Sequence, residues 1–450
     1  MQTIPALQQV RSKLARSVPR GAGDGDSFHG QVGAGRFTIL SVGLGSGVTF
    51  PNAAVSCPDA SEEFNARKEN LSGRGASTAC TVRVVSGTCA WSTPHRGNVS
   101  EVSFFTDDYE AAVERFYSER WTDGLPVILP TRKSVESVIK ASGRDREEVL
   151  GLMPPKGGQI TIEKLAVNAV MGGCSPALFP VVIAGVEAML EDEHNLNGVI
   201  QTTHMCVSLA IVTGPLAKQL GFNSADGVFG NGYRANGAVG RALRLAMWNL
   251  GGAVPGQTDM ATQSNPAEYA YCIAESEDSP WEPLHVERGL ERHDSAVTVF
   301  ACEGPHSADC IGTPGEMLYV LADTMASLGN NNVTSGGQTL VVLNPRQAEE
   351  FAKAGWTKHS IRNHLWENAR RTVAELRGCG QHRSGMRESF IKQGRNPFWF
   401  GVDLPSARIP VTNTPDDIHI VVAGGRTYFA AVCPGWGQFG GYAVTKKIRP

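Results

Sequence analysis

From residue 106 onwards, short strand-like segments alternate with helical segments. Apolar runs typical of buried strands occur at residues 125–129, 198–201, 209–213, 296–301, 340–343, 418–423 and 428–432. Helical spacing of apolar positions recurs between them, at residues 107–119, 134–151, 161–171, 176–190, 215–220, 238–250, 317–328 and 360–376. Because strands that alternate with helices favour crossover connections, the sequence predicts an α/β fold with a mixed, partly parallel sheet and helices on both faces.

Three regions differ in composition. Residues 1–100 are rich in Gly, Ser, Ala and Arg, with only two strand-like runs at 37–42 and 81–85, so we expect an irregular N-terminal region. Residues 101–377 carry the alternation and form the predicted α/β core. Residues 378–450 begin with a long connection up to about residue 415 and end in two strands of the same domain. No internal repeat is visible in the sequence.

Charge and hydropathy exclude several classes of partner. The formal net charge is −3 and neither half is strongly basic, so we expect no nucleic-acid partner. No apolar run reaches the length of a membrane span, and no apolar leader begins the chain, so we expect a cytoplasmic protein. We also expect a homo-oligomer. Residues 1–23 carry four basic residues and no acid, which leaves a mitochondrial presequence as the alternative. Ten dispersed cysteines without a Cys-x-x-Cys pair predict free thiols.

Cys174 is the candidate nucleophile. It follows Gly172-Gly173 and precedes Ser175-Pro176, residue types typical of a helix N-cap and first helical position. The free N–H groups and partial positive charge at a helix N-terminus lower the pKa of a nearby thiol and favour the thiolate. The alternative is a small buried cysteine without a chemical role.

Two histidines and a glutamate follow predicted strands. His204 comes after the run 198–201, and Glu303 and His306 come after the run 296–301. Side chains at the C-terminal ends of strands in an α/β sheet lie where ligands usually bind. We therefore expect His204 to act as the base for Cys174, and Glu303 and His306 to be further catalytic residues. A zinc or iron site formed by His204, His306 and Cys174 is an alternative, and a structural role for His204 is another.

A glycine-rich segment, 227–237, leads into the helix at 238–250. Such a loop before a helix N-terminus is typical of an anion site, so Asn231, Arg234 and Asn236 are expected to bind substrate, unless the segment is only a tight turn. Lys156, in a loop rich in Gly and Pro, is a further candidate. The glycine spacing matches neither a Walker loop nor the dinucleotide fingerprint, so we expect no nucleotide cofactor.

The helix at 238–250 is apolar around most of its circumference and should be buried. Its only charged residues, Arg241 and Arg244, are three positions apart and share one face. A buried guanidinium needs an anionic partner, because an unpaired charge costs several kcal/mol inside a protein. We expect Glu303 or a bound ligand to be the partner, which makes Arg241 another candidate for substrate binding.

Residues 110–450 resemble a group of uncharacterised, mostly bacterial proteins associated with proposed selenoproteins that carry a Sec-Gly-Ser-Cys motif. The motif itself is absent, and the closest run is Val85-Ser-Gly-Thr-Cys89. The resemblance implies thiol or selenol chemistry, with a thiol or selenol redox protein as a possible partner, and supports the location of the site. It is carried by the segments 120–127 (RWTDGLPV), 163–174 (EKLAVNAVMGGC), 202–204 (TTH), 234–245 (RANGAVGRALRL), 279–288 (SPWEPLHVER) and 421–425 (VVAGG).

Taken together, these features predict an enzyme that acts on a small anionic metabolite. Cys174 would be the nucleophile, His204 its base and Arg234 the anion-binding residue, in acyl transfer or in cleavage of a C–S or C–heteroatom bond. Two alternatives remain open. One is a hydrolase or lyase that depends on zinc or iron. The other is a non-catalytic carrier subunit that delivers a substrate to a redox partner.

Overall fold

The computed structural model describes residues 80–86, 100–106, 108–379 and 398–449. All described residues belong to one compact unit, residues 75–450, which is the second of two units along the chain. The expected strand at 37–42 therefore lies outside the described residues, as do most of the region 1–100 and the middle of the connection 378–415. The strand expected at 81–85 is present as β1 (Cys80–Ser86), which pairs antiparallel with β2 (Ser100–Thr106).

Two four-stranded mixed sheets organise the second unit. In the first, β5 (Val207–Thr213) pairs parallel with β6 (Cys272–Ala274) and antiparallel with β7 (Ala296–Cys302), and β14 (Val444–Lys447) adds antiparallel to β7. In the second, β9 (Thr339–Leu343) pairs parallel with β12 (Ile418–Val422) and antiparallel with β13 (Phe429–Pro434), and β8 (His306–Asp309) adds antiparallel to β13. The expected α/β class with partly parallel pairing is confirmed.

The two sheets have the same topology, so the fold contains a repeat that the sequence does not reveal. In the first sheet, β5 pairs parallel with β6 and antiparallel with β7. In the second sheet, β9 pairs in the same way with β12 and β13. The fourth strand of each sheet is exchanged: β8 follows β7 along the chain but pairs with β13, and β14 follows β13 but pairs with β7. This exchange ties the C-terminal segment into the first sheet.

The helices lie before, between and after these strands, and several of them cover the outer faces of the two sheets. Their bounds are α1 (Tyr109–Ser118), α2 (Arg132–Ser142), α3 (Ile162–Met171), α4 (Phe179–Met189), α5 (Leu196–Gln201), α6 (Pro215–Gln219), α7 (Arg234–Gly251), α8 (Leu284–Glu287), α9 (Pro314–Met325), α10 (Asn331–Ser335), α11 (Pro345–Lys353), α12 (Lys358–Asn368) and α13 (Val373–Gly378). Two further antiparallel pairs are β3 (Val149–Met153) with β4 (Gly158–Thr161), and β10 (Arg370–Thr372) with β11 (Arg408–Pro410). None of the described helices has the length and apolar content to cross a membrane.

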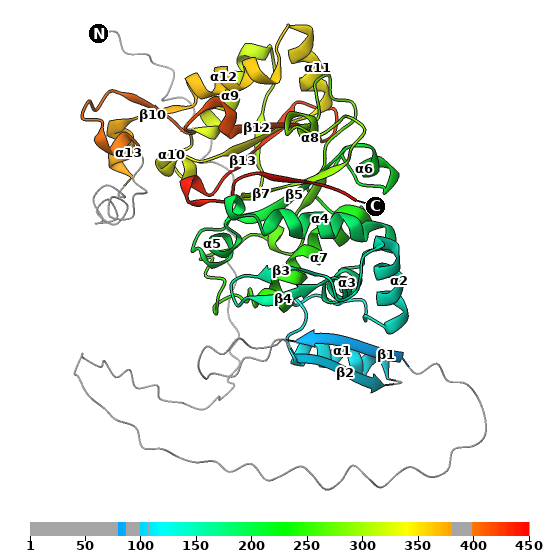
Figure 1. Ribbon diagram of the computed structural model, residues 1–450. Helices are drawn as coiled ribbons and strands as arrows, with labels where there is room; N and C mark the ends of the chain where they lie inside the picture. Colours follow the sequence, from blue (N-terminus) through cyan, green and yellow to red (C-terminus); the bar gives the residue numbers. More distant parts are fainter. Residues whose placement is uncertain (1–79, 87–99, 107, 380–397, 450) are drawn as a thin grey trace, which may run out of the picture. The chain divides into compact units, whose positions relative to one another are not determined.

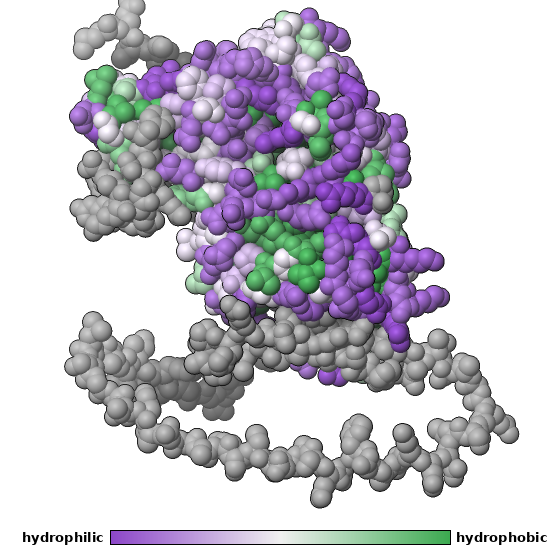
Figure 2. Space-filling view, viewed as in Figure 1, coloured by the Kyte–Doolittle hydropathy of each residue, from purple (hydrophilic) through white to green (hydrophobic). Residues whose placement is uncertain are grey.

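Alternation along the strands builds the layers. Successive side chains of a strand point to opposite faces, so Leu209 of β5 packs with Leu340 and Val342 of β9 between the two sheets. The intervening residues, such as Ala210, face α3, α4 and α7, while Val341 of β9 faces α9 and α12. The order is therefore helices, sheet, sheet, helices (Figure 1). Figure 2 shows the side of the molecule that is seen in Figure 1. Polar residues cover most of the described surface on this side, and an apolar patch lies around α4.

Four expected elements differ from the structure. The helix expected at 134–151 ends at residue 142 as α2, and residues 149–151 belong to β3. Residues 198–201 belong to α5, because Leu196, Val199 and Ile200 repeat at helical spacing and are buried on one face. Residues 125–129 form no strand; Leu125 and Pro126 instead direct their carbonyls at a side chain of α7. The segment 360–376 is not one helix, since α12 ends at Asn368 and β10 separates it from α13.

The long helix α7 is buried along most of its length, as its apolar sequence predicts. The prediction that Glu303 pairs with the arginines of α7 is wrong. Arg241 forms a two-pronged ion pair with Asp123, at 2.9 Å from Nε to Oδ2 and 2.8 Å from Nη2 to Oδ1. The same guanidinium donates to the carbonyls of Leu125 and Pro126. Arg241 therefore anchors the loop after α1 to α7, and this loop engages most of its N–H donors.

Replacing Arg241 by Leu should destabilise the fold by about 3 kcal/mol, because it leaves the Asp123 carboxylate buried without its partner. The side chains of Arg241 and Asp123 are only 17% and 5% exposed. The matched control is Arg132→Leu, which breaks an ion pair to Glu136 whose side chains are 73% and 49% exposed. That change should cost less than about 0.5 kcal/mol. Urea unfolding measures both, and equal losses in the two variants would contradict the structural role of Arg241.

Candidate functional site

His204 and Glu303 meet where the first sheet ends. Glu303 follows β7 directly, as expected, but His204 precedes β5 because the residues before it form α5 and not a strand. β5 and β7 are antiparallel, with Val207 opposite Cys302. The start of β5 therefore lies beside the end of β7, and the loop carrying His204 reaches the residue that follows β7.

The pair is joined by a hydrogen bond of 2.8 Å between His204 Nε2 and Glu303 Oε1. The two side chains are 19% and 21% exposed, so the contact is largely shielded from solvent. A carboxylate accepts hydrogen bonds, which assigns the proton of a neutral imidazole to Nε2. Nδ1 of His204 is then unprotonated and carries a lone pair. This buried atom has no hydrogen-bond partner among the described residues.

The backbone of Glu303 is held from both sides. Its N–H donates to the carbonyl of Pro434 at the end of β13, over 2.9 Å. The hydroxyl of Tyr271 donates to its carbonyl over 3.0 Å. An isolated antiparallel β-bridge, formed by the backbones of Cys302 and Gly435, also joins the ends of β7 and β13. Glu303 thus sits at a rigid junction between the two sheets, which suits a residue that must keep its side chain in a fixed position.

A pocket of about 470 Å³ opens beside Glu303. Its wall includes His306 at the start of β8, so two of the residues predicted to be catalytic line one cavity. Arg371 of β10 lies in the same wall and supplies a guanidinium. Its ion pairs to Asp323 and Glu375 are long, at 3.6 and 3.5 Å, so donor capacity remains for an anionic group. The other polar residues of the wall are Asp323, Thr324, Ser327 and Asn330.

His204 also borders a much smaller cavity, of about 10 Å³, which is close to the space that one water molecule needs. Arg244 of α7 lines this cavity and binds two carboxylates, Asp259 at 2.8 Å and Glu268 at 2.6 Å. Burial raises the pKa of Glu268 and the charge of Asp259 adds to this, while Arg244 opposes it. Asp259 and Glu268 thus share the single guanidinium group of Arg244 in the wall of the cavity that His204 also lines.

Cys174 lies elsewhere. It is buried at the start of the turn before α4, near Arg234, whose Nε donates to the carbonyl of Gly173 over 3.0 Å. Burial raises the pKa of the thiol to about 12, and the positive charge of Arg234 only partly offsets this. Ten residues of α7 separate Arg234 from Arg244, which is a distance of about 15 Å along the helix axis. No described contact joins Cys174 to His204, so the two do not form the expected nucleophile and base.

The other residues predicted to bind substrate are also spread out. Asn231 and Arg234 are exposed before and at the start of α7. Asn236 is buried, and its amide bonds the backbone of Asn223 and Cys272, a structural role. Lys156 is exposed and lies at the opposite end of α7, since its backbone N–H donates to the carbonyl of Gly251. The anion site expected at the glycine-rich loop therefore lacks Asn236 and Lys156.

The candidate metal ligands do not gather either. Within the residues that the structure describes, no three His, Cys, Asp or Glu side chains come together in a way that could hold a metal ion. His306 lies on the pocket wall, His204 is engaged by Glu303 and Cys174 lies near Arg234. Seven of the described cysteines are free thiols, as expected: Cys174, Cys206, Cys272, Cys302, Cys310, Cys379 and Cys433.

Sequence reasoning missed Arg371, Asp259 and Glu268. Arg371 lies in a segment, 360–376, for which the sequence predicts one helix, whereas the structure places it in β10. Asp259 and Glu268 lie in an irregular segment between α7 and β6, where no periodicity assigns a partner. The one usable signal was the requirement of Arg244 for a buried anion, which applies to any acid within reach and names none of them.

A buried thiol with a raised pKa should react slowly with iodoacetamide. At pH 7 a pKa of about 12 leaves only a trace of Cys174 as thiolate, so we expect alkylation at least about 100-fold slower than for free cysteine. The rate should rise about tenfold per pH unit up to the limit of native stability, since only the thiolate reacts. Peptide mapping by mass spectrometry reads out Cys174, and urea-unfolded protein is the control. Alkylation as fast as free cysteine would restore Cys174 as a nucleophile.

No protein-family model, curated protein or solved structure matches this chain. The resemblance to the selenoprotein-associated group thus remains an expectation. What the chain does has to be argued from the chemistry of the junction pocket and of the residues around it.

Proposed function

We propose that this chain is an enzyme that transfers protons to and from a small molecule carrying an acidic group. The observation that carries the proposal is the 2.8 Å contact between His204 Nε2 and Glu303 Oε1 beside a pocket of about 470 Å³. A carboxylate that lines a pocket and is oriented by a histidine behind it is the arrangement that general acid–base catalysis needs.

Glu303 is the proposed catalytic residue. His204 holds one carboxylate oxygen, Oε1, and leaves Oε2 for a proton of the substrate. His204 itself borders the small cavity with Arg244, Asp259 and Glu268, not the larger pocket. It is therefore a positioning residue, which fixes the carboxylate of Glu303.

The opposite roles in the pocket fall to His306 and Arg371. His306 is a second group that can give or take a proton, so one substrate could meet an acid and a base in the same cavity. Arg371 can hold a carboxylate or phosphate group of the substrate by charge-assisted hydrogen bonds. Proton abstraction next to a carbonyl and elimination of a small group are the reaction types that this set supports. Neither requires Cys174.

The carrier subunit is the alternative that the separation of Cys174 from His204 favours. A carrier would use the same pocket to bind its cargo without chemical change. The two proposals differ in a single respect, which is whether Glu303 matters for turnover or only the pocket matters for binding.

The test is conversion of metabolites by the Glu303→Gln variant. A mixture of small carboxylates and phosphate esters is incubated with the wild-type protein and followed by mass spectrometry. We expect one component to be converted, and Glu303→Gln to lower that rate by about 100-fold or more, because a positioned acid or base contributes 10²- to 10⁴-fold. Binding of the substrate should change little, since the amide has nearly the shape of the carboxylate.

The matched control is Glu277→Gln, a change at an exposed glutamate paired with Lys218 outside the pocket. It should leave the rate unchanged. A metabolite that binds the wild type and is never converted supports the carrier. Conversion that continues at the wild-type rate in Glu303→Gln rules out Glu303 as the catalytic residue.

A further inference from the structure

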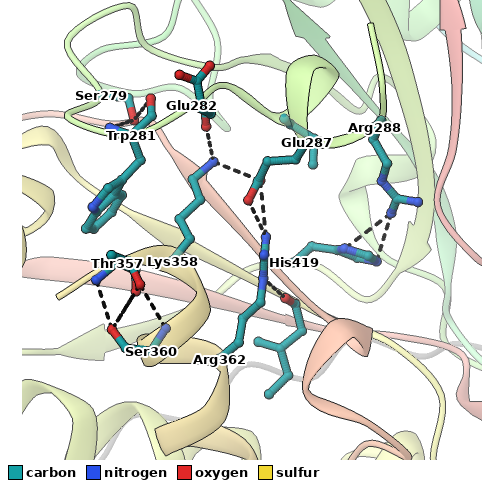
Figure 3. Close-up of polar contacts among 12 residues, drawn as sticks. Ser279, Trp281, Glu282, Glu287, Arg288, Thr357, Lys358, Ser360, Arg362 and His419 are labelled. Atoms are coloured by element: carbon teal, nitrogen blue, oxygen red, sulfur yellow. Dashed lines mark hydrogen bonds and ion pairs between the residues drawn. The ribbon is translucent and has the colours of Figure 1, made fainter.

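A second cavity, of about 360 Å³, lies at the start of β9 and β12. In the repeated topology this position in the second sheet corresponds to that of the His204 cavity in the first, at the start of β5 and β6. Its wall includes His419 of β12, Gln338 just before β9, Arg288 just after α8 and Arg362 of α12. Figure 3 shows both arginines beside His419 and Glu287.

Arg288 stacks on a neutral imidazole. His419 is buried, and burial together with the charges of Arg288 and Arg362 holds its pKa well below the usual range. Its Nε2–H donates to Gln338 Oε1 over 2.9 Å, an oxygen that also accepts the N–H of Ala443. The amide orientation of Gln338 is fixed by these two donors, and so is the tautomer of His419.

The geometry of the contact leaves the donors of Arg288 unused. Its Nη2 lies 3.3 Å from His419 Nδ1 and 3.4 Å from Nε2. An in-plane nitrogen at equal distances from both would collide with the C–H between them, so Nη2 lies over the ring face. Guanidinium groups stack in this way on aromatic rings. No described carboxylate forms an ion pair with Arg288, so its N–H groups remain available in the cavity.

The neighbouring cations outnumber the acids that bind them. Arg362 places Nη2 at 2.9 and 3.1 Å from the two oxygens of Glu287 and uses Nε for the carbonyl of Ile418. The buried Lys358 contacts the same Glu287 at 3.1 Å (Figure 3). It also contacts Glu275, at 3.4 Å. Two cations, Lys358 and Arg362, thus share two carboxylates, and Arg288 adds a third positive charge without an ion pair. The proximity of Arg362, added to burial, also lowers the pKa of Arg288.

Two aspartates on the wall, Asp416 and Asp417, limit this excess of positive charge. The carboxylate of Asp417 is engaged by the N–H and hydroxyl of Thr414, so it is turned to its own turn. Asp416 is exposed to solvent. Water screens an exposed charge far more than a shielded one. Arg288 is exposed as well, so the shielded positive charge of the wall is the guanidinium group of Arg362, whose side chain is 15% exposed.

We propose that this cavity binds a small oxyanion, a phosphate or a carboxylate, between Arg288 and Arg362. Arg288 offers its unpaired fork of N–H groups, held in place by His419 below it, and Arg362 offers Nη1. The site is separate from the Glu303 pocket and does not depend on the function proposed for it. A ligand here would contact both α8 and α12, and so could act as an effector or hold a second substrate.

The experiment is calorimetric titration of the full-length protein with inorganic phosphate and, separately, with succinate, at constant ionic strength set by chloride. We expect saturable binding of at least one anion, and the tighter of the two assigns the chemical class. Arg288→Gln should weaken this binding about tenfold or more, which is the loss expected for charge-assisted hydrogen bonds. Arg288→Gln should fold, because no described ion pair depends on Arg288; circular dichroism checks this.

The matched control is Arg292→Gln, four residues away, which removes an arginine with an exposed ion pair to Glu282. It should leave binding unchanged, and Asp416→Asn should tighten binding by removing a negative charge from the wall. Absence of binding of both anions at tens of millimolar, or equal binding by Arg288→Gln and wild type, overturns the proposal. Binding that is lost in Arg371→Gln but kept in Arg288→Gln also overturns it, because the anion then occupies the Glu303 pocket.

Discussion

The antiparallel pairing of β5 with β7 is the constraint on which the candidate site depends. It sets Val207 opposite Cys302, and this register alone places the residues before β5 beside those after β7. His204 and Glu303 are 99 positions apart in the chain, yet the pairing leaves them within hydrogen-bond distance. A slip of one residue would turn every side chain of β7 to the opposite face, and the buried layer between the sheets would no longer form.

The exchange of β8 and β14 makes the two sheets depend on each other. β14, at the edge of the first sheet, follows β13 of the second sheet along the chain, and β8, at the edge of the second sheet, follows β7 of the first. Neither sheet is therefore complete without a strand from the segment that follows the other sheet. The ends of β7 and β13 meet at this crossing, where Glu303 is anchored to Pro434. The junction is thus among the most constrained parts of the described fold, and it holds the residue to which we assign proton transfer.

Much of the fold was predictable because burial leaves a periodic pattern. The sequence predicts the apolar runs that form β5, β7 and β9 and the apolar helix α7. β6, β8 and β14 were missed, since each has only three or four residues. The run 198–201 was assigned to a strand because so short an apolar segment fits either structure.

The candidate site was predictable only in part. Glu303, His306 and His204 were identified as polar residues near strand ends, and they do lie around one junction. The pairing of Cys174 with His204 was not supported, because proximity across 30 residues is set by tertiary packing and not by local pattern. Arg241 and Arg244 show the same limit: the need for buried anions followed from the sequence, but Asp123, Asp259 and Glu268 could be named only from the structure.

The most direct test of the account is the protonation of the His204 ring in the folded protein. Nitrogen-15 NMR of the imidazole, at a pH where the ring is neutral, distinguishes a protonated Nε2 from a protonated Nδ1. The account predicts the Nε2–H form, with an Nε2 proton signal that shifts strongly when Glu303 is replaced by Ala. A ring protonated at Nδ1, or an Nε2 signal that is the same in both proteins, would show that His204 does not hold Glu303 and would contradict the central claim.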